Sequence, residues 1–443
     1  MFGVEQWTGI ILAAFFAVGC IFLIWRLRFF NDGTLPRKLY MFGFIVKLTA
    51  GTVLGWVYSS YYTDRAKADT FRYFDDSEVL YSSIYESPKS YLKMVTGFDS
   101  ESPELQVYYD KMNYWYDSYS PVNDNRAIIR TNSVLRLFSG GHYHIHMVIV
   151  CFLAFIGIVA STKALARFHQ LYSTPFYLSF IIVPSVVFWG SGLMKDSLGV
   201  FALGSTIYSL TNFRSKQDLT IKHIVLWIFC MSILMQTRFQ LFLLMCPLSI
   251  AWLIAVNVEK KGQALFLATY LSLTIATISA WGILFDKGFI DQLSQKRNAF
   301  IELALQEKSK SLFSTQQMET GFPEVLTEPF TGFFNSLTQP SLSSNTSAIN
   351  TIAGIENVMI VSILIFLTFL SLRNQPREWS LFLTLCMTLS ISYLAVTGMV
   401  TPVAGALVRY KAALIPYMII PMLVASGLGL GINKILGRFS LNK

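Results

Sequence analysis

The sequence has few of the features that mark a soluble enzyme. Only 14% of its 443 residues are charged, whereas a soluble protein usually has about 25%. The sequence lacks a glycine-rich phosphate loop, the residue order of a Ser-His-Asp catalytic triad, and an Asp-Glu or Glu-Asp-Glu metal motif. Nucleotide chemistry on the cytoplasmic side therefore lacks support. The cysteines lie in apolar stretches without metal-ligand spacing and are interpreted as small buried hydrophobic residues: Cys20, Cys151, Cys230, Cys246 and Cys386.

Long apolar stretches make up most of the chain instead. Hydrophobic residues account for 53% of it, and the mean hydropathy is +0.49. A helix needs about 20 apolar residues to cross the hydrocarbon of a bilayer, so we predict an all-α, polytopic integral membrane bundle. The first stretch lacks the basic lead-in of a signal peptide and is kept as a span. About eleven transmembrane helices are expected, at residues 8–25, 40–60, 145–165, 174–192, 194–211, 222–236, 239–256, 263–285, 354–372, 379–398 and 409–431.

Basic residues follow every second predicted span, which is the positive-inside pattern. This alternation predicts that the N-terminus lies outside and the C-terminus lies in the cytoplasm. It also accounts for the formal net charge of +9, so no nucleic-acid partner is expected. The residues that carry the pattern are Arg26, Arg28, Arg37, Lys38, Lys163, Arg167, Arg214, Lys216, Lys222, Lys260, Lys261, Arg373, Arg377, Lys434, Arg438 and Lys443.

Two long polar segments interrupt the spans, and the predicted topology puts both outside. The first, residues 61–143, follows the first two spans (1–60) and is acidic and rich in Tyr. A short amphipathic helix on the membrane surface is expected at 78–95, and turns and loop at 97–126. The second segment, residues 287–353, separates the central spans (144–286) from the last three spans and the cytoplasmic tail (354–443). It begins with a helical pattern and then becomes rich in Pro and Ser, with Phe residues that suit the interface.

The acidic residues Asp69, Asp75 and Asp76 come soon after the second span, which puts them just above the outer leaflet. A carboxylate beside a low-dielectric surface can serve as a general base. Asp69 is the preferred base because it lies nearest to the membrane, with Thr70 and Tyr73 as neighbouring hydrogen-bonding residues. Asp75 remains a rival, and a solvated acidic loop without catalytic function is the alternative.

A second motif lies in residues 184–197. Gly190, Ser191 and Gly192 interrupt an apolar stretch, and Lys195 and Asp196 open the next helix. Backbone N–H groups at a helix N-terminus favour an anion, and Lys195 adds a full positive charge. Asp196 would cap the helix, pair with Lys195 or bind a divalent cation. An ordinary hairpin turn with a capping Asp is the alternative.

Three more cations, Arg238, Arg409 and Lys411, stand at the outer ends of apolar stretches. Arginine clamps phosphate with two parallel hydrogen bonds, and lysine adds a point charge. For each of them, snorkelling to lipid headgroups is the alternative. Because they share one face with the acidic segment, we predict a site in which the substrate and its phosphate contact Tyr73, Lys195, Asp196, Arg238, Arg409 and Lys411.

Histidines at alternate positions, His142, His144 and His146, precede the third span. Only the first and last share a helix face, and no Glu joins them as in a zinc protease motif. They are interpreted as interfacial residues.

The acidic motif at 68–73 and the general layout of the chain resemble polytopic GT-C type glycosyltransferases. The segment 184–196 and the terminal residues 405–411 with Pro416 are similar to motifs of bacterial glycosyltransferase-like or polymerase-like membrane proteins. Members of the GT-C superfamily use polyprenyl-phosphate sugars. The resemblance implies that an Asp in the first long outside loop, here Asp69, is the base, and that basic residues on later loops hold the lipid phosphate. In this chain the acidic segment follows the second span, whereas the superfamily usually places it after the first.

The resemblance implies a transferase of the cell envelope, active at the outer, periplasmic face of a bacterial inner membrane. Its partners would be a lipid-linked sugar donor, membrane lipids and a glycan, lipid or protein acceptor. Mg²⁺ or Mn²⁺ is a possible cofactor, and the oligomeric state is left open. An O-antigen-like polysaccharide polymerase is an alternative with the same substrate class. A transporter or flippase of lipid-linked saccharides is an alternative of another class, although the chain has no internal repeat.

Overall fold

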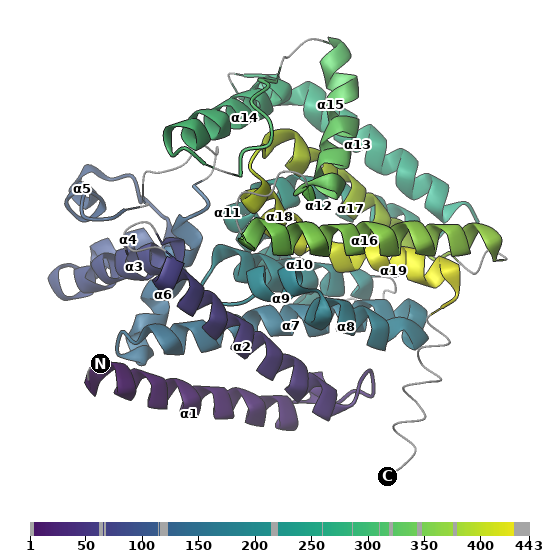
Figure 1. The fold of residues 1–443 in the computed structure, drawn as a ribbon. Coiled ribbons are helices and arrows are strands. Elements are labelled where there is room, and N and C mark those ends of the chain that lie inside the picture. Colours follow the sequence, from purple (N-terminus) through teal and green to yellow (C-terminus); the bar gives the residue numbers. More distant parts are fainter. Residues whose placement is uncertain are drawn as a thin grey trace. The chain divides into compact units, whose positions relative to one another are not determined.

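The structure is a computed structural model that describes residues 4–61, 65, 68–113, 115, 123–213, 220–258, 260–285, 287–309, 311–318, 322–342, 348–374 and 379–428. Within these ranges every regular element is a helix, and the only β contact is an isolated bridge between Leu312 and Val403 (Figure 1). The predicted all-α class is confirmed. The chain divides into a first unit, Met1–Ser161 with Val187–Thr206 and Leu226–Phe239, and a second unit, Thr162–Val186 with Ile207–Val225 and Gln240–Lys443.

Six helical stretches in the described part are long and apolar enough to cross a membrane. They coincide with six of the expected spans, which supports an integral membrane protein. One of these stretches joins α7 to the 3-10 helix η4 (Gln170–Tyr172) and to α8 (Ser173–Ile182). The long helices concerned are α1 (Val4–Arg26), α2 (Arg37–Tyr61), α7 (Tyr143–His169), α13 (Gly262–Leu284), α16 (Ala348–Arg373) and α17 (Leu381–Val400), with η1 (Arg28–Phe30) between the first two.

The remaining apolar stretches are shorter or broken. The stretch expected to span at 174–192 consists of α8 and α9 (Pro184–Trp189), and a proline opens the second helix because its ring cannot continue the first. The last stretch consists of α18 (Ala404–Ala412) and α19 (Ile415–Ser426), bent by 59°, and would be a seventh span if counted as one. The count of eleven therefore stays a prediction. The other helices here are α10 (Lys195–Asn212), α11 (Ile221–Thr237) and α12 (Phe239–Ala255).

The segment after α2, expected to be mostly loop, is largely helical. It contains α3 (Asp69–Glu86), α4 (Pro88–Thr96), η3 (Pro103–Leu105), α5 (Gln106–Tyr109) and α6 (Arg126–Ser139). The single helix expected at 78–95 is divided at Ser87, because Pro88 disfavours a helical residue before it and suits the first turn of a new helix. The Ser87 side chain accepts a hydrogen bond from the Ser90 backbone N–H at 3.2 Å and caps α4. Helices α3, α4 and α6 pack together in the first unit (Figure 1).

Close helix packing in the first unit depends on glycine. On α7, a Cβ at Gly157 would lie 2.5 Å from the Cα of Phe201 on α10, and Gly204 of α10 is equally tight against α7. On α2, a Cβ at Gly51 would lie 2.7 Å from the sulfur of Cys151 and 3.0 Å from the backbone nitrogen of Gly192. These glycines allow the segment before α10 to lie directly on α2 and α7.

The second unit contains two further helices in the segment expected outside, α14 (Phe289–Gln306) and α15 (Phe322–Thr338). Helix α15 packs along the candidate span α17, where a Cβ at Gly398 would lie 2.6 Å from the Ser336 hydroxyl. That hydroxyl donates to the Leu394 carbonyl at 2.7 Å. The buried Arg297 of α14 donates to the Met399 carbonyl at 3.0 Å, so α14 is held at the end of α17 as well.

Candidate functional site

The three predicted acidic residues all lie on α3 but have different surroundings. Asp69 is its first residue and is half-buried. Asp75 is 39% exposed and makes a two-fold contact with the guanidinium of Arg65, at 2.8 and 2.7 Å. Asp76 is buried, and one carboxylate oxygen accepts hydrogen bonds from the backbone and side-chain nitrogens of Asn113 at 2.7 and 2.8 Å. Two of the three carboxylates thus have strong protein partners.

The contact with Asp75 also changes the pKa of Arg65. The hydrogen bond to Asp75 raises the pKa of Arg65 above its ordinary value, against the smaller opposing effect of burial. Arg65 therefore stays charged at neutral pH. A proton acceptor at Asp75 would have to give up this contact.

The two predicted motifs of the first unit meet at Asn125. The hydroxyl of Tyr73 donates to the Asn125 side-chain oxygen at 3.1 Å, and the ammonium of Lys195 donates to the same oxygen at 3.1 Å. Lys195 also forms an ion pair with Asp124 at 2.7 Å, and its side chain is only 10% exposed. A residue from α3 and the first residue of α10 therefore share one acceptor just before α6.

A second connection joins the same two segments. The Thr70 hydroxyl donates to the Leu193 carbonyl at 3.1 Å and lies 2.7 Å from the Tyr143 hydroxyl. Leu193 belongs to the turn at 190–194, where Gly192 has a φ of +80°, a left-handed conformation that favours glycine. The Lys47 ammonium of α2 donates to the Gly190 carbonyl at 2.5 Å. The turn before Lys195 is thus fixed from α2 and α3.

Asp196 and Arg238 form a buried ion pair between the start of α10 and the junction of α11 and α12. Their side chains are 7% and 11% exposed. Pairing with Lys195 was one of the roles expected for Asp196, but Asp196 pairs with Arg238 and Lys195 pairs with Asp124. Both sequence-predicted cations of the first unit are therefore next to carboxylates.

Four residues of the site were not predicted: Asp124, Asn125, Arg126 and Arg130. Asp124, Asn125 and Arg126 lie at the end of the segment 97–126, which was expected to be turns and loop, and Arg130 lies in α6 just after it. Arg126 contacts Glu101 at 2.5 Å, and its guanidinium lies 4.7 Å from the ring centroid of Trp115. The only signal in the sequence was the density of polar residues at 123–126, which is also typical of a turn.

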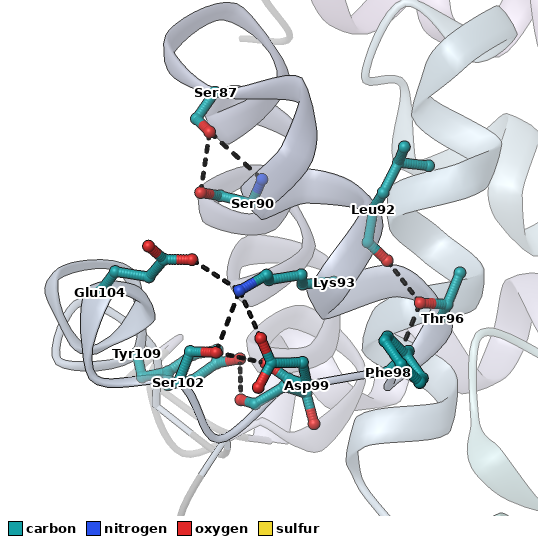
Figure 2. A network of polar contacts seen from close by, with 11 residues as sticks. Ser87, Ser90, Leu92, Lys93, Thr96, Phe98, Asp99, Ser102, Glu104 and Tyr109 are labelled. Atoms are coloured by element: carbon teal, nitrogen blue, oxygen red, sulfur yellow. Dashed lines mark hydrogen bonds and ion pairs between the residues drawn. The ribbon is translucent and has the colours of Figure 1, made fainter.

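A polar network around Lys93 fixes the loop after α4 (Figure 2). The Lys93 ammonium contacts Asp99, Ser102 at 3.1 Å and Glu104 at 2.7 Å. The hydroxyl of Tyr109 donates to the Ser100 carbonyl at 2.5 Å, and its ring stacks on Trp115 at 4.5 Å. The network thereby supports the aromatic ring that Arg126 contacts.

The charges of this network reinforce one another. Hydrogen bonding to Asp99 and Glu104 raises the pKa of Lys93, and hydrogen bonding to Lys93 lowers the pKa of both carboxyls. All three groups are charged at neutral pH as a result. This arrangement suits a structural clamp.

Arg409 and Lys411 belong to α18 in the second unit. The buried Lys411 ammonium donates to the carbonyls of Ser336 and Gln339 at 2.7 and 2.8 Å and to the side-chain oxygen of Asn357 at 2.6 Å. An ammonium has three N–H donors, so protein acceptors use all of them. Lys411 thus holds the C-terminal end of α15, where a cation is favourable. Its expected contact with phosphate, and that of Arg409, stays a prediction.

The histidine string contributes one buried side chain. His146 lies between the Ser139 hydroxyl, at 2.6 Å from its Nε2, and the Asn132 side-chain oxygen, at 3.0 Å from its Nδ1. These contacts satisfy both ring nitrogens inside the protein. In the part of the chain that the structure describes, no three His, Cys, Asp or Glu residues are grouped so that they would hold a metal ion.

Comparison of the chain with known protein families, with curated proteins and with solved structures finds no match.

Proposed function

We propose that this chain is a membrane glycosyltransferase. It transfers a sugar from a polyprenyl-phosphate-linked donor to an acceptor hydroxyl at the outer face of a bacterial inner membrane, for the synthesis of an envelope polysaccharide. In this proposal the chain crosses the membrane about eleven times, with the N-terminus outside and the C-terminus in the cytoplasm. The six candidate spans support the membrane location in this proposal.

The observation that carries the proposal is the shared Asn125 oxygen. Tyr73, from the acidic segment, and Lys195, from the segment before α10, both donate to it. Neither the hydrophobic effect nor helix propensity requires two polar segments of a membrane protein to meet in this way. Burying polar groups costs free energy unless they are hydrogen-bonded, and such clusters in membrane proteins usually have a function.

In the proposed reaction, the Asp69 carboxylate accepts the proton of the acceptor hydroxyl. The hydroxyl oxygen forms a bond to the anomeric carbon, and the bond from that carbon to the phosphate oxygen breaks. The phosphate leaves with the bonding electrons. Thr70 supports Asp69 as the base, because it follows Asp69 directly and bonds to Leu193, two residues before Lys195.

Cations stabilise the leaving phosphate in this proposal. Charge that develops in the transition state is stabilised best by groups that are already in place. Lys195 and Arg238 are held by Asp124 and Asp196 in the first unit. A phosphate contact of Arg409 is expected from the sequence alone, and within the second unit Lys411 fixes α18, which carries Arg409. No step requires a divalent cation, and whether Mg²⁺ or Mn²⁺ assists is a question for the same assay.

The proposal is tested with purified protein in nanodiscs and a panel of polyprenyl phosphates that carry radiolabelled hexoses. Transfer of label to a saccharide acceptor, lost in the Asp69→Asn variant, would support it. Movement of labelled lipid across proteoliposomes without bond formation would instead establish the transporter or flippase.

An O-antigen-like polymerase is the second candidate, and the arginines of α6 favour it. Arg126 and Arg130 increase the number of cations near the Asn125 site without adding a carboxylate on that helix. A polymerase that relies on arginine would lose activity when Arg238 or Arg409 is replaced by Ala and keep it in the Asp69→Asn and Asp75→Asn variants. The transferase predicts the opposite for Asp69→Asn.

A further inference from the structure

The guanidinium of Arg130 is half-buried, and its hydrogen bonds to the described residues go to neutral groups. Its Nε donates to the Met94 carbonyl at 2.8 Å, at the end of α4, and its Nη1 donates to the Gln236 side-chain oxygen at 3.2 Å, at the end of α11. The ring centroid of Trp115 lies 5.4 Å from its central carbon. A carbonyl, an amide and an aromatic ring orient the guanidinium, but none of them carries a negative charge.

The other cations of this region have carboxylate partners. Arg126 pairs with Glu101, Lys195 with Asp124 and Arg238 with Asp196. Arg130 takes part in none of the ion pairs found among the described residues. Its nearest charged neighbour on α6 is the like-charged Arg126, one turn away. Of these four cations, Arg130 is the one with no carboxylate within ion-pair distance among the described residues.

A half-buried guanidinium without a close carboxylate is unfavourable for the protein alone. Burial lowers the pKa of Arg130 and the charge of Arg126 lowers it further, against smaller opposing effects of Tyr109 and Glu101. Arginine nevertheless remains protonated in proteins, so the charge persists. A half-buried charge is stabilised by an opposite charge that binds with hydrogen bonds. The partner that Arg130 lacks among the described residues can come from a ligand.

The guanidinium has donors available for such a ligand. Arginine has five N–H donors; the two hydrogen bonds to Met94 and Gln236 use two, and three remain. Nη2 makes no hydrogen bond to the described residues and is not among the buried polar atoms. Gly97, at φ +79°, lies beside it, and a Cβ there would approach Nη2 to 3.1 Å. The glycine keeps this side of the guanidinium uncrowded.

We propose that Arg130 binds the phosphate of the lipid-linked donor. This inference rests on the proposed function and adds a phosphate contact that the sequence did not indicate. Gln236, which orients Arg130, is two residues before Arg238, and Arg238 pairs with the first turn of α10. The Arg130 site is thus connected through α11 to the segment that carries Lys195. Phosphate suits the planar arrangement of guanidinium donors.

The test measures binding, without turnover, by the full chain in nanodiscs. Two probes are used, a fluorescent polyprenyl phosphate and inorganic pyrophosphate, with wild type, Arg130→Gln, Arg130→Lys and Lys89→Gln. Loss of a charge-assisted contact should weaken polyprenyl phosphate binding about tenfold or more in Arg130→Gln. Lys89→Gln is the control, because it removes an exposed cation of α4 that lies outside the site, and it should change binding less than about threefold.

The outcomes separate this proposal from the proposed function. If wild type binds polyprenyl phosphate and Arg130→Gln binds it equally well, Arg130 is not the contact, and the transferase is unaffected. If wild type binds only pyrophosphate, and Arg130→Gln weakens that binding, Arg130 is confirmed as a phosphate contact. The same result rejects a lipid-linked donor as the ligand. If neither probe binds wild type, both proposals are overturned. Should Arg130→Gln not fold, Arg130→Lys decides the question, since a lysine keeps the charge but loses the planar fork, and undiminished binding to it would contradict the proposal.

Discussion

The ammonium of Lys195 lies 2.7 Å from the carboxylate of Asp124, across 71 residues of sequence. Lys195 is the first residue of α10, and Asp124 stands just before α6. Their contact, with the shared Asn125 oxygen beside it, joins two helices of the first unit through charge rather than through apolar packing.

Removing the ammonium should destabilise the protein. The Lys195→Met variant leaves the Asp124 carboxylate without this partner, and loss of one member of a partly buried charged contact costs about 1–3 kcal/mol. The double variant Lys195→Met/Asp124→Asn should recover most of the lost stability but none of the transfer activity. Thermal unfolding in detergent measures the first effect. Equal unfolding temperatures for Lys195→Met and wild type would show that the pair contributes nothing.

The close contact between α7 and α10 at Gly157 leads to a second prediction, about stability. Gly157→Ala introduces a methyl group against the α10 backbone near Phe201, where only a shift of a whole helix can make room. We expect a loss of about 1–3 kcal/mol. The control is Gly19→Ala on α1, where nothing lies within 4 Å of the new carbon and where alanine favours the helix. If both variants unfold at the wild-type temperature, the close packing is not as described.

The stabilisation that Lys93 provides through Asp99 and Glu104 should depend on pH only at strongly acidic and strongly basic values. Pairing lowers the pKa of Asp99 and Glu104 below their ordinary values of 3.8 and 4.5, so its stabilisation is complete above those values and is lost as pH falls through the lowered ones. Pairing raises the pKa of Lys93 above 10.5, so the stabilisation is lost again only as pH rises past the raised value.

Hydrogen-exchange protection of residues 97–105 tests this clamp, once the intrinsic exchange rate is corrected for pH. Protection should be constant between about pH 5 and pH 10 and fall outside that range. The Lys93→Met variant should lose protection throughout, whereas Lys89→Met, an exposed lysine on the same helix, should not. A steady decline of protection between pH 8 and pH 5 would mean that another group holds the loop.

Replacing Lys411 and replacing Arg409 should affect stability and activity differently, although the two residues are only two positions apart. Lys411→Met leaves the acceptors at Ser336, Gln339 and Asn357 without their donor, and each buried acceptor left unsatisfied costs about 1–3 kcal/mol. Its unfolding temperature should therefore drop strongly. Arg409→Gln should unfold near the wild-type temperature and lose transfer activity. A stable Lys411→Met protein with weakened donor binding would restore the phosphate role that the sequence suggested for Lys411.

The sequence predicted the membrane helices well because their signal is length and hydropathy. Helices such as α1, α2 and α13 agree with the expected spans to within a few residues. The expected span at 174–192 was not continuous, since Pro184 starts a new helix within it. Hydropathy averages over a window and does not register such a break.

Helix α3 was harder to predict, because its buried face is partly polar. Thr70, Tyr73, Ser77 and Leu80 recur at helical spacing and are buried, but two of them would be counted as polar. The acidic motif was therefore assigned to a loop, whereas it lies in α3. Arg130 was missed for a different reason. It was singled out because its contacts include no carboxylate, and those contacts are known only from the structure.

The central claim is that the first unit carries the base of a sugar transfer, and activity of the Asp69→Asn variant tests it most directly. Purified wild-type protein and the Asp69→Asn, Asp75→Asn and Asp76→Asn variants are given radiolabelled polyprenyl-phosphate hexoses and a saccharide acceptor. The account predicts transfer by wild type and a loss of about 100-fold or more in Asp69→Asn, with Asp75→Asn retaining most of its activity. Full transfer by a folded Asp69→Asn protein would contradict it.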